Sequence, residues 1–184
     1  DLCDHLEYAQ QTGNGDLEVV GCAQHEACGF RDGDFVDIKS AARAIRGCMQ
    51  DLEADSSIYV SGFTYNIAGS HLHSVQARAQ VSITSGPRPI RQADVDKVLK
   101  QARSMAIPFD QKILTVTPVE YAGDRVRGIT DPLGRVGSLL EVTAHLVTGS
   151  RSVLSNIQNT IVEAKFKGLG EEVDILAAGM ALLQ

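Results

Sequence analysis

Residues 75–83, VQARAQVSI, alternate strictly between apolar and polar side chains, and this pattern constrains the fold more than any other. Successive side chains of a β-strand point to opposite faces of a sheet, so the pattern predicts a strand with one buried and one wet face. An amphipathic helix is expected over Ala93–Met105, with strands at Ile113–Val116, stopped near Pro118, and at Leu139–Thr148. A sheet with one helix on its face is an α+β module, and this block is self-contained.

The segments on either side of this block predict a second group of elements. Leu2–Gln11 and Leu17–Cys22 are expected to form a hairpin about a turn at Thr12–Asp16. A loop at 28–36 is expected to precede a helix over Ile38–Leu52, which is capped by Asp37 or Asp34, and a short buried strand at Ile58–Val60 follows this helix. After the middle block we expect a helix that is capped by Ser150 or Ser152 and ends at Gly168 or Gly170. The last expected elements are a strand at Val173–Leu176 and a helix at Ala177–Leu183. If these flanks meet, the middle block is an insertion between them.

Charge and composition argue against a nucleic-acid partner. The chain holds 17 Lys and Arg against 23 Asp and Glu, a net charge of −6, with no Trp and 5% aromatic residues. We therefore expect no nucleic-acid partner, since phosphate backbones attract basic surfaces and single strands need stacking platforms.

The longest apolar run, 175–183, is about half of the roughly 18 residues that a spanning helix needs. Without a signal peptide the expected location is cytoplasmic. Because the chain begins at Asp1, we expect it to be a piece of a longer polypeptide.

No residue pattern indicates catalysis, and we expect neither an enzyme nor a catalytic site. Nucleophile-elbow, zinc-protease and phosphate-loop motifs are all missing. Cys22, His25 and Cys28 offer three zinc ligands without a fourth, so half-buried strand cysteines are the favoured interpretation and no metal is expected. His71 and His73 share one strand face without a neighbouring carboxylate, and we interpret them as structural or surface residues.

Two polar segments are candidate contacts for a protein partner. Lys97, Lys100 and Arg103 form a basic stripe on the outer face of the Ala93–Met105 helix, although a solvated helix face is the ordinary interpretation. Residues 124–137 are expected to form a long loop in which Asp131-Pro-Leu-Gly has the composition of a turn. The candidate contact residues are Lys97, Lys100, Arg103, Arg125, Arg127, Asp131 and Arg135.

From residue 66 onwards, the chain resembles the FtsA family of actin-like bacterial cell-division proteins. The most distinctive match is GITDPLG at 128–134, and the ordered series extends over residues 17–184. The other matching words are NIAGSH at 66–71, ADVD at 93–96, AIP at 106–108, IL at 113–114, PVEY at 118–121, EVTAHLVT at 141–148 and NI at 156–157, with the loop Gly29-x2-Asp32-Gly33 before the first long helix. Arg91 departs from the family, which often places a helix-capping Thr there.

The resemblance implies a partial actin-like, ribonuclease H-like subdomain 1A with an inserted SHS2-type β-α-β-β subdomain 1C. It assigns 1–74 to the first part of 1A, 75–149 to 1C and 150–184 to the return of the chain to 1A. The implied role is that of a scaffold that links the FtsZ ring to the membrane and recruits later division proteins. The related pilus-assembly protein PilM is the alternative.

The family's partners and cofactor divide between this chain and subdomains expected outside it. FtsZ and the membrane would be held by missing parts, the membrane through a C-terminal helix at the division site on the cytoplasmic side of the inner membrane. Later division proteins and second copies would contact 1C. Full-length members bind ATP, but Asp1–His5 lacks the glycine of the first phosphate turn, so no cofactor is expected here.

Overall fold

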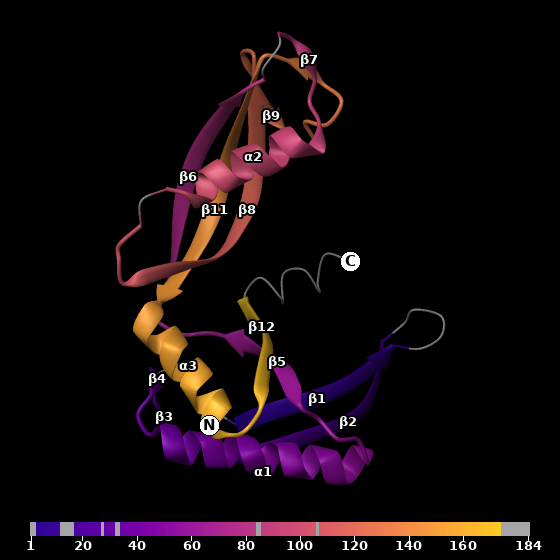
Figure 1. Cartoon of the computed structure of the whole chain (residues 1–184), viewed down its shortest axis with the longest axis vertical. Coiled ribbons are helices and arrows are strands. Elements are labelled where there is room, and N and C mark those ends of the chain that lie inside the picture. The colour runs from indigo at the N-terminus through magenta and orange to yellow at the C-terminus, as the bar shows by residue number, and fades with distance from the viewer. Residues whose placement is uncertain are drawn as a thin grey trace. The chain divides into compact units, whose positions relative to one another are not determined.

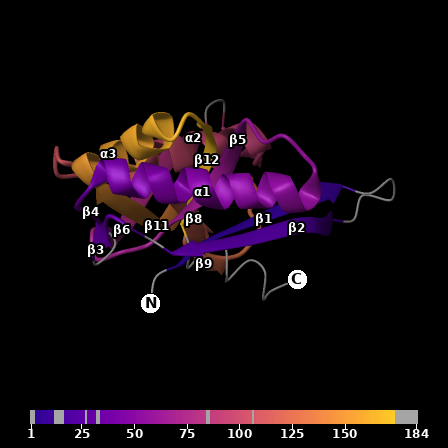
Figure 2. The same ribbon diagram turned by 90° about the horizontal axis from the view of Figure 1, so that it is seen from below.

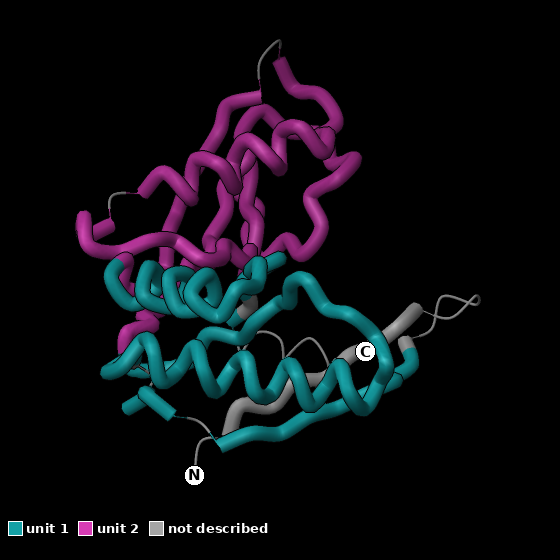
Figure 3. The backbone as a smooth tube through the Cα atoms, turned by 60° about the horizontal axis from the view of Figure 1, so that its bottom comes forward, with its two compact units in different colours: residues 1–70, 152–184 teal, residues 71–151 magenta. Residues whose placement is uncertain are grey.

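The computed structural model divides the chain into two compact units, residues 1–70 with 152–184 and residues 71–151 (Figures 1 and 3). The structure describes residues 3–11, 17–26, 28–31, 34–83, 86–105 and 107–173. The second unit lies where the sequence pattern predicted an insertion over 75–149, and the assignment of the two units to named subdomains stays a prediction. In the described ranges, no helix combines the length and apolar character needed to span a membrane.

The first unit contains a hairpin, β1 (Cys3–Gln11) with β2 (Leu17–Glu26), which packs against α1 (Ile38–Ser56) (Figure 2). Cys48, Met49 and Leu52 of α1 are buried with Ala23 of β2 in its core. The remaining elements are the short pair β3 (Phe30–Arg31) and β4 (Asp34–Phe35), α3 (Arg151–Glu163), and β5 (Gly62–Ile67), which pairs in parallel with β12 (Lys167–Val173). The chain thus leaves this unit after β5 and returns through α3.

The predicted cap of α1 is confirmed at Asp37. Its carboxylate accepts the backbone N–H groups of Lys39 and Ser40 at 3.0 and 3.2 Å, and the Ser40 hydroxyl as well. These hydrogen bonds, the Ser40 hydroxyl first, lower the pKa of Asp37. At the other end the helix stops at Ser57, whose φ of 58° is left-handed.

The second unit is a four-stranded antiparallel sheet with one helix on one face. Its strand order is β6-β11-β8-β9, and the strands are β6 (Leu72–Ser82), β8 (Gln111–Gly123), β9 (Val126–Ile129) and β11 (Leu139–Ser150). The helix is α2 (Gln92–Arg103), and β7 (Arg88–Pro89) pairs with β10 (Val136–Gly137). The α+β class is confirmed.

Alternation along the strands and helical spacing in α2 build the core of this unit. Val98 of α2 and Leu140 and Leu146 of β11 are completely buried. Ala77 and Val81 of β6 are buried on the same side, as the alternation predicted, whereas Leu99 of α2 is only partly buried.

Five local predictions are wrong, and strand pairing or local geometry explains each. The strand predicted to stop near Pro118 continues to Gly123, because the ladder shifts register between Thr143 and Ala144 and accommodates Pro118. Residues 124–137 are no continuous loop, and neither are residues 28–36, because both contain paired strands. Residues 58–60 form no strand, and Tyr59 is 85% exposed. The glycines at 168 and 170 lie within β12, not at a helix end.

The end of α3 comes earlier, near Lys165, whose φ of 71° is left-handed. Three further predictions fall on residues outside the described ranges: the turn at 12–16, the helix at 177–183, and the strand at 173–176 beyond Val173.

Candidate functional site

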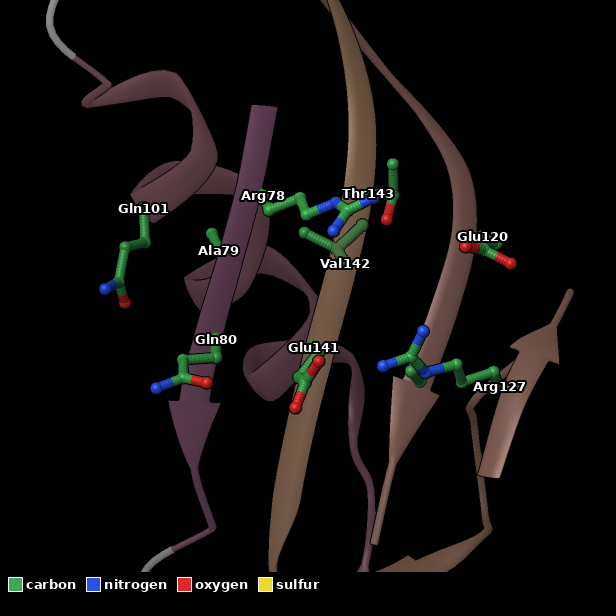
Figure 4. A pocket seen from close by; sticks show the side chains of 10 residues that line it. Arg78, Ala79, Gln80, Gln101, Glu120, Arg127, Glu141, Val142 and Thr143 are labelled. Carbon is green, nitrogen blue, oxygen red and sulfur yellow. The ribbon is translucent and has the colours of Figure 1, made fainter. Parts of the chain in front are cut away.

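The face of the second unit's sheet that α2 does not cover is polar. We call it the open face and define it by seven residues, Arg78 and Gln80 of β6, Glu120 and Ala122 of β8, Arg127 of β9, and Glu141 and Thr143 of β11 (Figure 4). Their positions follow from alternation, since Ala77 and Val81, on either side of Arg78 and Gln80 in β6, face the core. The sheet therefore presents a wet surface, as the sequence pattern predicted.

Two arginines and two glutamates interleave across this face. Thr143 lies opposite Arg78 on one side and Glu120 on the other, while Glu141 lies opposite Gln80 and Ala122. A hollow of about 350 Å³ is lined by the open face together with Ala79, Val142 and Gln101 of α2. No ion pair joins the four charged groups in the described part of the chain. A mixed row of this kind suits a partner with alternating charges better than a phosphate, which needs a uniformly basic site.

The predicted basic stripe lies on the exposed side of α2. Lys97, Lys100 and Arg103 are all exposed, whereas Val95 and Val98 of the same helix point into the core. Lys100 and Arg103 fall in the last turn, where the helix dipole favours positive charge. The stripe is thus both accessible and compatible with an ordinary solvated helix face.

The segment before β9 is a tight turn held by a carboxylate. Asp124 and Arg125 have positive φ values of 45° and 77°. The Asp124 carboxylate accepts the Ser138 hydroxyl and backbone N–H, both at 2.7 Å, and these bonds lower the pKa of Asp124. The turn therefore projects Arg125 into solvent.

The segment after β9 is a second ordered turn. Asp131 accepts the backbone N–H of Leu133 at 3.0 Å, and Gly134 donates to the carbonyl of Ile90 at 3.0 Å. Ile90 in turn donates to the carbonyl of Arg135 at 2.8 Å. Asp131 thus helps to shape the turn, and both Asp131 and Arg135 are exposed.

The seven predicted contact residues do not form one patch. Arg127 belongs to the open face, Lys97, Lys100 and Arg103 to α2, and the remaining three to the two turns. Sequence reasoning missed Arg78, Glu120 and Glu141. The alternation at 75–83 already indicated that Arg78 is exposed on the wet face, but the two glutamates meet it only through strand register.

The structure does not bring Cys22 and His25 together. The two residues lie on opposite faces of β2: His25 packs toward Gly47 of α1, while Cys22 is exposed. Cys28 is exposed too, so the interpretation of these cysteines as half-buried strand residues is wrong. The described residues contain no cluster of three metal-ligating side chains.

An ion pair supports the start of α2 where Arg91 replaces a capping side chain. Arg88 binds Asp94 through two contacts, 2.8 and 2.9 Å, and Asp94 also accepts the backbone N–H of Arg91 at 3.0 Å. These interactions, the Arg88 hydrogen bonds first, lower the pKa of Asp94 to about 2. Asp94 thus satisfies the N–H that a cap residue leaves open.

The sequence matches a family and several curated proteins. Residues 69–148 match the family described as the SHS2 domain inserted in FtsA. The chain is 31% identical to the cell division protein FtsA of Neisseria meningitidis serogroup B over 91% of its length, and 30% identical to that of Streptococcus pneumoniae serotype 2 over 93%. It spans 40% and 36% of those two proteins, or about two fifths of their length.

A solved structure shares the fold. The structure titled "PilM-PilN type IV pilus biogenesis complex" aligns with 98% of this chain and 47% of its own chain, at a TM-score of 0.62 and 11% identity. At that identity the likeness shows the fold alone. Together with the family match, it confirms the predicted fold class, an actin-like part with an inserted SHS2 domain.

Proposed function

We propose that the chain belongs to the FtsA family of cell-division proteins and acts in division as a scaffold through protein–protein contacts, not as an enzyme. The observation that carries the proposal is the match of 69–148 to the SHS2 domain of FtsA, which falls on the compact unit 71–151. That unit has its own hydrophobic core, so its outer surfaces are available for contacts that its folding does not need.

The proposed contact surfaces are the open face and the basic stripe. The open face offers charges of both signs on a rigid sheet, and the stripe offers three cations on a helix whose cap is fixed by the Arg88–Asp94 pair. Arg125, Asp131 and Arg135 lie on ordered turns outside these two surfaces. Later division proteins and a second copy of the chain are the proposed partners.

The remaining family roles need parts of the protein that the matched relatives carry outside this region. We assign the link to FtsZ, ATP binding and membrane attachment to those parts. The full-length protein would then act at the division site, peripheral on the cytoplasmic side of the inner membrane. The fold likeness to PilM is the observation behind the alternative role in pilus assembly, and the sequence relatives favour division.

Grafting provides the test. Residues 71–151 would replace the matching segment of the Neisseria meningitidis protein, and septation would be scored in cells that depend on the hybrid. We expect division to be retained. Reversing Lys97, Lys100 and Arg103 to Glu should then weaken partner contacts in a two-hybrid assay, and more so at low salt in a binding assay.

Two controls make this test specific. In the binding assay, run with the 184-residue chain, reversing the exposed cations Lys39 and Arg43 of α1 in the first unit is the control, and it should leave the partner contacts intact. A stable hybrid that abolishes division would contradict the scaffold proposal. Normal contacts after reversal of the stripe would remove the stripe from the contact surface.

A further inference from the structure

Strand β6 is a long, regular edge strand. It pairs with β11 over eleven register positions, Leu72 to Ser82, without a register shift. In the described sheet it has no second neighbour, because it ends the order β6-β11-β8-β9. Edge strands usually carry a proline, a bulge or inward charges that prevent pairing with another chain. β6 has none of these devices, and its only acidic or basic side chains are His73 and Arg78.

The backbone geometry shows which groups this edge offers. Ile83 donates its N–H to the carbonyl of Ser138 at 2.8 Å, which continues the β6–β11 ladder, and Thr148 of β11 contacts the carbonyl of His73. The odd-numbered residues therefore turn their N–H and C=O groups toward β11. The even-numbered residues, from Leu72 to Ser82, turn theirs outward.

The sequence of the edge, SVQARAQVS at 74–82, alternates apolar with polar residues and has no like-charge clash when two copies run antiparallel with Leu72 against Ser82. On the α2 side this register sets Val75 opposite Ala79, Ala77 opposite Ala77 and His73 opposite Val81. On the open face it sets Ser74 opposite Gln80 and Gln76 opposite Arg78. On the α2 side Val75 is 37% exposed, so a neighbouring strand would cover apolar surface that the unit leaves in water.

We propose that β6 pairs with β6 of a second copy, antiparallel about a two-fold axis at Ala77, joining two four-stranded sheets into one. This register uses the full strand, Leu72 against Ser82, and sets Gln76 opposite Arg78 of the partner. An axis at Arg78 would oppose two arginines, which is unfavourable. The pairing is isologous, so it closes at a dimer. It rests on the proposed function, because it names the surface for the second-copy contact.

The test uses the full 184-residue chain in sedimentation equilibrium, with amide hydrogen exchange over a concentration series. We expect a concentration-dependent dimer in which the amides of Ser74, Gln76 and Gln80 gain protection, while those of odd-numbered β6 residues are protected throughout. High salt should not dissociate the dimer, because backbone hydrogen bonds carry the contact. Each copy has a net charge of −6, and salt screens the repulsion between the two copies.

Opposite charges at one position test the register. Gln76→Glu faces Arg78 of the partner at two symmetry-related pairs and should tighten the dimer, whereas Gln76→Lys should weaken it, by about 2- to 30-fold in Kd. The matched controls are Thr117→Glu and Thr117→Lys, at an exposed site of β8 that β11 separates from β6, and both should leave Kd unchanged. Gln76→Pro removes an outward N–H without breaking the β11 ladder and should abolish pairing.

Three results would overturn the inference. They are a monomer at all concentrations with unprotected even-numbered β6 amides, a dimer indifferent to Gln76→Pro, and equal effects of Glu and Lys at position 76. The grafting experiment scores division and not pairing, so failure of one proposal is distinguishable from failure of the other.

Discussion

Replacing Asp94 with Asn tests the ion pair that begins α2. Asp94 accepts two hydrogen bonds from Arg88 and one from the Arg91 backbone, and its pKa is lowered from 3.8 to about 2. A shift of that size corresponds to roughly 2.5 kcal/mol at full effect. The Arg88 and Asp94 side chains keep 27% and 13% exposure, so solvent screens part of it. We expect the variant to lose about 1–2 kcal/mol of unfolding free energy at pH 7.

The pH dependence follows from the direction of the shift. A lowered carboxylate pKa contributes stability that is complete above the unfolded-state pKa, near 4, and is lost as pH falls through about 2. Wild-type stability should therefore fall between pH 5 and pH 2 by more than that of Asp94→Asn, and the two curves should converge at the acid end.

Urea unfolding, followed by NMR through the amides of Val98 and Leu146, reports on the second unit alone. Asp96→Asn is the matched control, since Asp96 is exposed on the same helix and accepts a hydrogen bond from the Gln92 amide at 2.9 Å. It should cost less than about 0.5 kcal/mol. Parallel wild-type and Asp94→Asn curves between pH 5 and pH 2, or equal costs for both variants at pH 7, would refute this account of the cap.

Four further variants probe packing and backbone: the two leucine variants use the same unfolding assay, and the two glycine variants are followed through amides of both units, because Gly29 lies in the first unit and Gly134 in the second. Leu146→Ala removes a completely buried side chain and should lower the free energy of unfolding by about 2–5 kcal/mol. Leu99→Ala, at a partly buried site, should lower it by about 1–2 kcal/mol. A loss below about 0.5 kcal/mol for Leu99→Ala would place that side chain outside the core. Gly29 has a φ of 83° and an added Cβ would clash with the Asp37 carbonyl oxygen, so Gly29→Ala should cost more than the roughly 1 kcal/mol of the left-handed backbone alone. Gly134→Ala, with a φ of 74° and open space, is its control, and equal costs would show that the contact with Asp37 is unimportant.

Local patterns in the sequence determined the elements whose stability is local. The cap at Asp37 and the apolar spacing after it define α1, and the alternation at 75–83 defines both β6 and its wet face. In these segments a single face is buried, so the period of the apolar residues carries the information. The polarity of the open face was therefore predictable, and so was the exposure of the stripe on α2.

Tertiary pairing decided the rest, because its partners lie far apart in the chain. β8 continues past Pro118 only because β11 accommodates a shift in register there, and β12 forms a strand through Gly168 and Gly170 because β5 lies beside it in parallel. For the same reason the open face acquired Glu120 and Glu141, which no local pattern places beside Arg78. The regular alternation of β6 is visible in the sequence, but only the strand order shows that β6 lies at the edge of the described sheet.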